Sequence, residues 1–212
     1  MSEKIGLFEA IRTMRAMRRL KPDPVPDELI RKIIEAGLCA PSGGDMQNWR
    51  FIVVKDAEIK LQIQIRYKRA LEQVMPRFHA APIPGKSDDQ KARRLSAVEY
   101  LTDHFHEAPV MIVACLVGDM GRSAGLEKMS GASIYPAVEN MLLAARGLGL
   151  GATLTTRHLF YEKEINEILG IPPNAETFAI IPIGYPMGRF GGLSRLALEE
   201  VTFSDRWGKP WR

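Results

Sequence analysis

The chain has 212 residues, 46% of them hydrophobic, and its 29 basic residues exceed its 25 acidic residues to give a formal charge of +4. Because domains usually contain about 100 to 200 residues, this length predicts one domain with a buried core. The charges are interspersed and no zinc-finger spacing or RNA-binding signature is present, so nucleic acid is not expected as a partner.

The sequence also argues against export and against a membrane span. Residues 1–14 are charged and lack the apolar run of a secretory signal. The most apolar stretch, 131–154, is interrupted by Glu139, Asn140 and Arg146, which are costly in hydrocarbon. The two cysteines, Cys39 and Cys115, form no CxxC pair. We therefore expect a cytoplasmic protein with free thiols.

The first third of the chain predicts two helices and a strand. Apolar residues spaced by three predict a first helix within 3–15, which the three prolines of segment 22–26 end. Asp27 is the expected N-cap of a second helix that stops before Pro41. Segment 49–55 is rich in aromatic and β-branched residues and predicts a strand after a glycine-containing turn.

The middle of the chain predicts a lid and a buried helix. Segment 66–107 is charged and broken by Pro76, Pro82 and Pro84, which indicates a helical excursion over the core. Its aromatic residues, Tyr67 and Phe105 among them, would line a substrate mouth, although a solvated helical pair fits equally well. A strand is expected over 109–118, and a helix over 134–148 that is apolar around most of its circumference and would suit a dimer core.

The last third predicts strands over 152–156 and 178–184, a helix over 162–169 that ends at Gly170, and a final strand over 198–203. Together the elements predict an α+β fold with a mixed central β-sheet flanked by helices. The aromatic tail 206–212 is expected to pack on a partner subunit, because large rings are seldom left in water.

Several catalytic signatures are absent. The four histidines form no HExxH motif, so no metal site is expected. Ser42 lies in Pro-Ser-Gly-Gly rather than Gly-x-Ser-x-Gly, which favours hydrogen bonding over nucleophilic catalysis. Gly147, Gly149 and Gly151 follow a helix and precede a strand, the reverse of a dinucleotide-binding turn, and predict a helix stop with close packing.

A basic cluster lies between residues 12 and 21. Arg15 and Arg18 are three residues apart, so on a helix they would share a face and could hold a phosphate by bidentate hydrogen bonds. Taken alone, the cluster fits a solvated helix end better.

With segment 40–51, which reads APSGGDMQNWRF, the basic cluster resembles the nitroreductase-like flavoproteins. In that family an arginine-rich opening is followed by a helix, then Ala-Pro-Ser, then Gln-x-Trp-x-Phe. The resemblance extends to segments 147–151, 180–186 and 195–201. It implies a homodimer with FMN at each of two subunit interfaces and NADH or NADPH as electron donor.

The resemblance also implies the cofactor-binding residues. By position, the flavin phosphate and pyrimidine edge would be met by Arg15, Ala16, Met17, Arg18, Arg19 and Arg195, and the ring system by Pro41, Ser42, Gly43, Asp45, Gln47, Leu154, Thr155 and Thr156. No catalytic side chain is expected, because such chemistry belongs to the cofactor; Arg18 would give electrostatic support to reduced FMN.

Three positions depart from the family pattern. Ala16 stands where many members have Ser, Asp45 where Asn is common, and Asn48 where Pro precedes the tryptophan. An ionised Asp45 only accepts hydrogen bonds, and its charge would disfavour an anionic reduced flavin.

The function expected from the resemblance is ping-pong hydride transfer to an electron-poor acceptor such as a nitroaromatic, quinone or enone. One alternative is reductive dehalogenation, as in iodotyrosine deiodinases, but these clamp their substrate through a Glu four residues before a Tyr, and no Tyr here has that Glu. The others are a flavin-binding or redox-sensing protein without turnover, and a basic binding module without flavin.

Overall fold

The computed structural model describes residues 5–80, 87–118 and 127–211. The helices are α1 (Leu7–Thr13), α2 (Asp27–Leu38), α3 (Ala57–Ala80), α4 (Asp88–Asp103), α5 (Glu127–Gly147), α6 (Glu162–Leu169) and α7 (Leu198–Val201), with short 3-10 turns η1 (Gly43–Asp45), η2 (Phe105–Glu107) and η4 (Arg157–Tyr161). The strands are β1 (Trp49–Val54), β2 (Val110–Val117), β3 (Gly151–Ala152) and β4 (Ala175–Gly184).

The strands form one sheet in the order β1-β2-β4-β3. Each neighbouring pair is antiparallel, and Trp49 of β1 lies opposite Leu116 of β2. The α+β class is therefore confirmed, but the expectation of a mixed sheet is wrong for the described strands. The connections between β1 and β2 and between β2 and β4 contain helices and are long enough for either strand direction, so sequence alone did not decide the antiparallel pairing.

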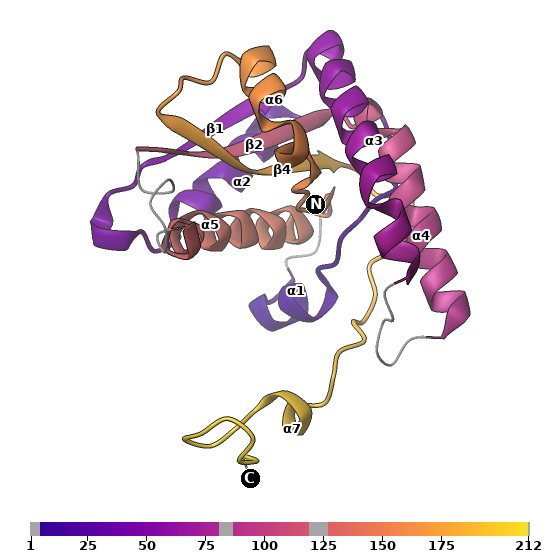
Figure 1. The fold of residues 1–212 in the computed structure, drawn as a ribbon, viewed down its shortest axis with the longest axis vertical. Coiled ribbons are helices and arrows are strands. Elements are labelled where there is room, and N and C mark those ends of the chain that lie inside the picture. Colours follow the sequence, from indigo (N-terminus) through magenta and orange to yellow (C-terminus); the bar gives the residue numbers. More distant parts are fainter. Residues whose placement is uncertain (1–4, 81–86, 119–126, 212) are drawn as a thin grey trace.

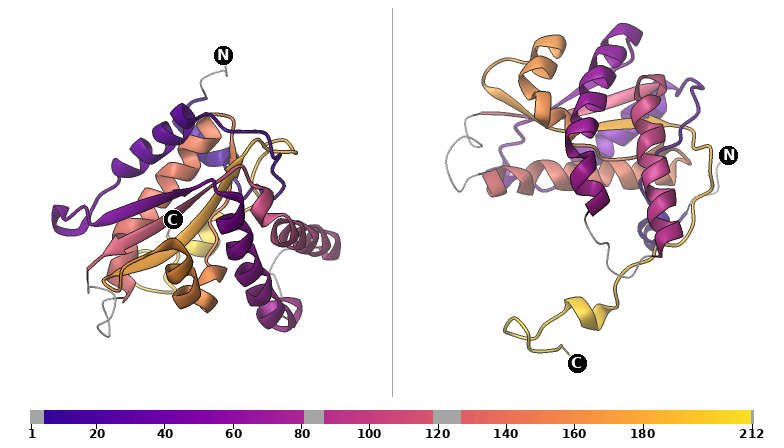
Figure 2. Two further views of the ribbon diagram at one scale, coloured as in Figure 1. Left: turned by 90° about the horizontal axis from the view of Figure 1, so that it is seen from above. Right: turned by 45° about the vertical axis from the view of Figure 1, so that its right-hand side comes forward.

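Helices cover both faces of the sheet (Figures 1 and 2). In β2, Val110, Ile112 and Ala114 pack in one core cluster with residues of α2 and α5, whereas Met111 and Val113 pack in another with residues of α3 and α6. Side chains alternate between the faces of a strand, so an uninterrupted apolar run marks a strand buried on both sides. The uninterrupted apolar run in segment 109–118 is therefore explained by the burial of both faces of β2.

Several predicted helices are confirmed with shifted ends. The helix over 162–169 ends at Gly170, which adopts the left-handed conformation (φ 64°) of a helix C-cap. The expected break at Pro76 is wrong, because α3 continues to Ala80. Asp27 is not an N-cap: Pro26 occupies that position, and the Asp27 carboxylate pairs with Lys55 across to the end of β1.

The last two predicted strands differ more. In place of a strand over 152–156, β3 ends at Ala152, and Thr155 forms a separate bridge with Ile180. In place of a strand over 198–203, the chain forms the short helix α7, and Phe203 after it makes one isolated β-bridge with Pro210 instead of pairing with the sheet. A strand needs a partner edge, and this segment has left the sheet.

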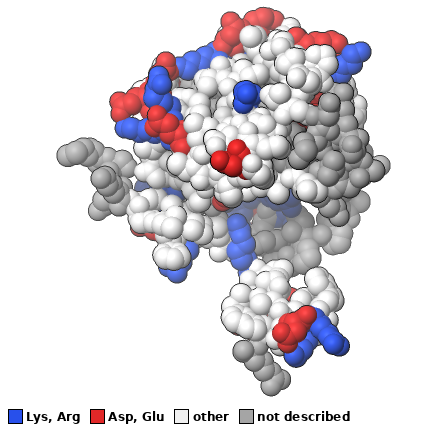
Figure 3. Space-filling view, turned by 90° about the vertical axis from the view of Figure 1, so that its left-hand side faces the viewer, with Lys and Arg blue, Asp and Glu red and all other residues white. Residues whose placement is uncertain are grey.

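The C-terminal segment extends away from the rest of the chain as a separate arm (Figure 1). It carries exposed apolar side chains, with Trp207 92% exposed. Seen from the side, the arm forms its own lobe, and the body above it has a wide area with few charged side chains (Figure 3). Within the described residues, no helix is long and apolar enough to span a membrane.

Candidate functional site

The basic segment after α1 is extended rather than helical. Helix α1 ends at Thr13, and Met14 has β backbone angles. Met17 N–H donates to Ala152 O (3.0 Å), and Met187 N–H donates to Arg19 O (3.0 Å), so the segment runs along the β3 edge and the end of β4. The expectation that Arg15 and Arg18 share a helical face is therefore wrong. Backbone pairing with the sheet edge replaces helical hydrogen bonds.

Because segment 15–20 is extended, some of its side chains are buried and others are exposed. Met17 and Leu20 are each only 8% exposed and pack with Ala108, which anchors the backbone. Gly151 permits this approach, since a Cβ there would lie 2.9 Å from Met17 Cβ. Arg18, the next residue, is half-buried and lies close to Tyr67. The predicted helix stop and close packing at the Gly147–Gly151 motif are both confirmed.

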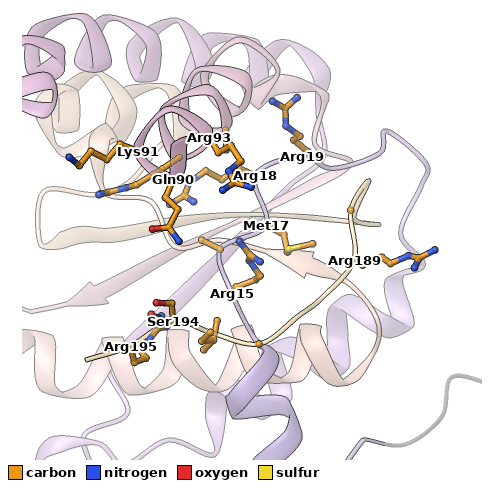
Figure 4. Close-up of a pocket in the computed structure, with 16 residues that line it drawn as sticks. Arg15, Met17, Arg18, Arg19, Gln90, Lys91, Arg93, Arg189, Ser194 and Arg195 are labelled. Atoms are coloured by element: carbon orange, nitrogen blue, oxygen red, sulfur yellow. Dashed lines mark hydrogen bonds between the residues drawn. The ribbon is translucent and has the colours of Figure 1, made fainter. Parts of the chain in front are cut away.

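A cavity of about 820 Å³ lies beside this segment (Figure 4). It is lined by three parts of the chain: residues 15–19, the first half of α4, and the loop 188–195. Eight of the lining residues are cationic and none is acidic: Arg15, Arg18, Arg19, Lys91, Arg93, Arg94, Arg189 and Arg195. Arg195 thus meets the N-terminal arginines in space, as the family resemblance implied.

These cations lack carboxylate partners. In the described part of the chain, only Lys91 among them forms a salt bridge, with Asp88 of its own helix (2.9 Å). Arg19 instead donates to Ser96 Oγ (3.1 Å) and lies over the Tyr100 ring (4.3 Å). Like charges gathered without a counter-charge repel one another, and an anion would relieve that repulsion.

Arg18 is the half-buried member of the cluster. Burial lowers the pKa of its guanidinium; Tyr67 opposes this shift, whereas Arg94, Arg157 and Arg15 add to it. Arg157 Nη1 in turn donates to the Tyr67 hydroxyl (3.2 Å). Arg157 is therefore a second guanidinium close to Arg18, although it does not line the cavity, whereas Arg18 does and can donate charge-assisted hydrogen bonds to an anion there.

Two aromatic residues expected at a substrate mouth lie in the core instead. Tyr67 is 3% exposed and Phe105 0%, and their rings stack at 4.2 Å. Their apolar area is buried between α3 and η2, where it stabilises the fold. Tyr100 is less buried and faces Arg19, whereas the side chains of Phe78 and His79 lie outside the described residues. The excursion reaches the cavity through α4.

The loop from Pro41 to Gln47 is a second group of predicted flavin-binding residues, separate from the basic cavity. Ser42 Oγ accepts the Gln47 N–H (2.9 Å), which confirms a hydrogen-bonding role for this serine. Asp45 and Gln47 both have positive φ (54° and 46°), and Gln47 Nε2 donates to Asp45 Oδ1 (2.8 Å). Such backbone is unusual outside glycine and marks a loop held in one shape.

Within one chain this loop lies far from the cavity. Gly43 N–H donates to Ser133 Oγ (3.0 Å) near the start of α5, whereas Arg146 Nε near its end donates to Thr13 Oγ1 (2.9 Å), close to Arg15. At about 1.5 Å rise per residue, these two points of α5 are about 20 Å apart. Gly43 and Gly44 line a smaller cavity of about 300 Å³, which shares no residue with the first.

The third predicted group, Leu154 to Thr156, follows β3. Thr155 is buried and its Oγ1 donates to Ile180 O (2.7 Å), so it fixes the chain to β4, while Leu154 and Thr156 are exposed. Thr156 immediately precedes Arg157, which interacts with Arg18. This group therefore lies on the Arg18 side of the molecule, although it does not line the cavity.

Two contributions escaped the sequence interpretation. The cations of α4 line the cavity, although the charge of segment 66–107 had indicated only a solvated or lid-forming pair. The helical spacing of Gln90, Arg93, Arg94 and Ala97 in the sequence could have predicted that these residues share one face of a helix.

Asn48, where the family has Pro, uses its side chain: Nδ2 donates to Val117 O (2.9 Å) and links the start of β1 to the end of β2. No group of three potential metal ligands occurs among the described residues.

Known proteins resemble this chain over most of its length. The model of the nitroreductase family matches residues 11–185. The chain is 30% identical over 196 residues to an NADH dehydrogenase of Thermus thermophilus, covering 89% of this chain and 90% of that one. An iodotyrosine deiodinase of Daphnia pulex is 30% identical over 84% of this chain and 58% of its own length.

Solved structures share the fold. The NADPH:FMN oxidoreductase from Vibrio harveyi, complexed with NAD⁺, superposes with a TM-score of 0.72 at 20% identity, over 96% of this chain and 78% of that one.

Proposed function

Because the chain belongs to the nitroreductase family, we propose that it is an FMN-dependent oxidoreductase that uses NADH or NADPH to reduce an electron-poor acceptor such as a nitroaromatic, quinone or enone. The observation that carries this proposal is the cavity where Arg15, Arg18 and Arg195 converge without a carboxylate partner. A phosphate carries about two negative charges at neutral pH and accepts bidentate guanidinium bonds. The donor set therefore fits a flavin phosphate.

The residues have distinct roles in this proposal. Arg15 and Arg195 bind the phosphate, and the backbone of Ala16 and Met17, fixed to the β3 edge, sets where it lies. Arg18 faces the pyrimidine edge, where its positive charge favours the reduced state. Arg19 is held by Ser96 and Tyr100, so it positions α4 and takes a smaller part in binding.

The chemistry that FMN supplies when bound is two-electron transfer, received from NAD(P)H in one half-reaction and given to the acceptor in the next. The protein's part is to bind, orient and tune, which accounts for a site built from guanidiniums instead of an acid–base pair. In this proposal Leu154 to Thr156, which directly precede Arg157 in the chain, lie near the flavin ring.

We further propose a homodimer in which each site takes residues from both copies. Pro41, Ser42, Gly43, Asp45 and Gln47 match the family's flavin-binding loop, yet they lie about 20 Å along α5 from the arginines of the same chain. The same flavin can meet both groups only if the loop comes from a second copy.

Exposed apolar surface supports the dimer. Leu7 and Phe8 of α1 and Trp207 and Trp211 of the arm are all more than half exposed. Patches of this kind on a soluble protein usually mark an interaction site. Sedimentation should give a dimer, and removal of residues 196–212 should shift it toward monomer and lower FMN affinity. A monomeric full-length protein that binds FMN normally would refute the shared site.

Reductive dehalogenation is the competing enzyme activity. A relative named iodotyrosine deiodinase covers most of the chain, but the Glu–Tyr pair of that clamp is missing from this sequence. The free cations here favour anionic or electron-poor planar acceptors, whereas an amino-acid zwitterion needs charges of both signs.

The first experiment is the colour of the purified protein. We expect a yellow protein with an FMN spectrum, bleached anaerobically by NADH or NADPH and reoxidised by nitroarenes or quinones. Colourless protein that FMN cannot reconstitute would refute the proposal. Bleaching without reoxidation by any acceptor, halophenols included, would favour a non-catalytic flavin protein.

Arg18→Ala tests the assigned role. Loss of a charge-assisted hydrogen bond costs about 1.5–3 kcal/mol, so FMN should dissociate at least tenfold more readily and reduction by NAD(P)H should slow. Arg31→Ala is the matched control, since Arg31 is exposed on α2 and does not line the cavity. Unchanged FMN affinity and reduction rate in Arg18→Ala would contradict the role.

A further inference from the structure

Helix α4 presents a basic stripe to the cavity. Gln90, Arg93, Arg94 and Ala97 are spaced as i, i+3, i+4 and i+7, which is one face of a helix, and all four line the cavity. Figure 4 shows Arg93 close to Arg18, with Ser194 and Arg195 on the opposite side of the cavity. The cavity therefore has two basic walls.

The α4 wall is held in place by the rest of the site. Arg19 binds Ser96 Oγ (3.1 Å) and stacks on Tyr100, whose hydroxyl donates to Met187 Sδ (3.5 Å). A capping box between Ser87 and Gln90 fixes where the helix begins. Arg93 and Arg94 are thus presented by a docked helix. Arg93 Nε donates to Asp89 O (3.3 Å), but neither guanidinium forms a salt bridge within the described chain, in contrast to Lys91.

The positive charge exceeds what one flavin phosphate needs. Lys91 is neutralised by Asp88, and Arg189 points away from the other lining side chains (Figure 4). Without Arg19, which Ser96 and Tyr100 hold, five arginines remain in the lining, whereas one phosphate carries about two negative charges. Burial is the main cause that lowers the pKa of Arg18, and the charge of Arg94 on α4 adds to it, so the α4 wall lies near the wall formed by residues 15–19. A second anionic ligand would neutralise the surplus.

The electron donor is the ligand that brings such charge. The pyrophosphate of a nicotinamide dinucleotide carries about two negative charges, and a 2′-phosphate, where present, adds about two more. The pyrophosphate alone leaves part of the surplus positive charge unmatched, and the 2′-phosphate of the phosphorylated form supplies further negative charge. A terminal phosphomonoester also suits two adjacent guanidiniums, because each can give it paired hydrogen bonds.

We propose that Arg93 and Arg94 of α4 bind the 2′-phosphate of the electron donor, so that this protein prefers NADPH to NADH. The inference rests on the proposed oxidoreductase function and specifies its donor. Gln90 uses its side-chain oxygen in the capping box, where it accepts the Ser87 N–H (3.1 Å), and so orders the helix instead of binding the phosphate.

The test compares Arg93→Gln/Arg94→Gln with Arg31→Gln/Lys163→Gln, both in FMN-loaded protein. The control removes the same charge from exposed positions on α2 and α6 that do not line the cavity. For the α4 variant we expect kcat/KM for NADPH to fall at least tenfold and that for NADH less than threefold, with FMN affinity within threefold of wild type. The control should change none of these.

Direct binding gives a readout that does not depend on activity. By calorimetry, wild type should bind adenosine 2′,5′-bisphosphate at least tenfold more tightly than 5′-AMP, and the α4 variant should lose that difference. Higher salt should narrow it, since screening weakens exposed charge pairs. Because this measurement needs no electron transfer, it tests the phosphate site even if the protein does not turn over.

The other possible results distinguish failure of the NADPH assignment from failure of the proposed oxidoreductase function. Equal use of NADPH and NADH by wild type, or an unchanged ratio in the α4 variant, overturns the inference and leaves the oxidoreductase function standing. Loss of FMN from the α4 variant assigns these arginines to the flavin and also overturns it. A loss confined to a phosphorylated acceptor, tested with 4-nitrophenyl phosphate against 4-nitrobenzyl alcohol, overturns the donor assignment. Protein that neither donor reduces overturns the proposed function itself.

Discussion

His158 makes the stability of this protein depend on pH. The side chain is 0% exposed in η4, and neither ring nitrogen has a hydrogen-bond partner among the described residues. Burial lowers its pKa from 6.5 to about 4, since a charged imidazole cannot be solvated there. The folded protein therefore holds this histidine neutral, while the unfolded chain takes up a proton below about pH 6.5.

The direction and size of the effect follow from these two values. Between pH 6.5 and 4 the unfolded state binds more protons, so the free energy of unfolding falls as the pH falls. With a folded pKa of about 4, the loss from pH 7.5 to pH 5 is about 2 kcal/mol, and it levels off near 3 kcal/mol below pH 4. Above about pH 7, His158 contributes no pH dependence.

The assay is urea unfolding at both pH values, at fixed protein concentration and saturating FMN. We expect His158→Leu to remove about 2 kcal/mol of the pH dependence, whatever its stability at pH 7.5. Leu169→Ala, in the core cluster on the α3 and α6 face of the sheet, is a control that destabilises without removing a titratable group. Parallel pH curves for wild type and His158→Leu would refute the reasoning.

Two further substitutions test the site. Gly151→Ala places a Cβ 2.9 Å from Met17 Cβ and Leu20 Cδ2. We therefore expect the free energy of unfolding, measured in urea, to fall by about 1–3 kcal/mol and FMN to bind more weakly. Wild-type values for both would mean that the basic segment tolerates displacement. Asp45→Asn removes a negative charge while keeping a residue that tolerates positive φ (54°), and it should raise the flavin midpoint potential by about 30 mV, or about 1.4 kcal/mol for two electrons. A lower potential in spectroelectrochemistry would argue against a repulsive role for Asp45.

Local patterns in the sequence predicted most of the core. The uninterrupted apolar run around Ile112 predicted a strand buried on both faces, and both faces are covered. Gly170 predicted a helix end, which occurs in the left-handed conformation that glycine adopts most easily. These predictions succeed because side-chain periodicity and backbone propensity act within a few residues.

Predictions failed where contacts with a segment distant in the sequence determine the backbone conformation. Arg15 and Arg18 have helical spacing, but hydrogen bonds from Met17 to β3 hold the segment extended. Segment 198–203 has the composition of a strand but finds no sheet edge within the described chain. Hydrogen bonds between segments far apart in sequence leave no local signal.

The sequence by itself determined the class of fold, the buried strands and, through the resemblance of its basic and Ala-Pro-Ser segments, the family. Only the tertiary structure showed that Arg195 joins the N-terminal arginines, that α4 adds a second basic wall, and that the Pro41 to Gln47 loop lies at the far end of α5. The reason is physical: composition records how many charges a chain has, whereas their electrostatic effect depends on how closely folding brings them together.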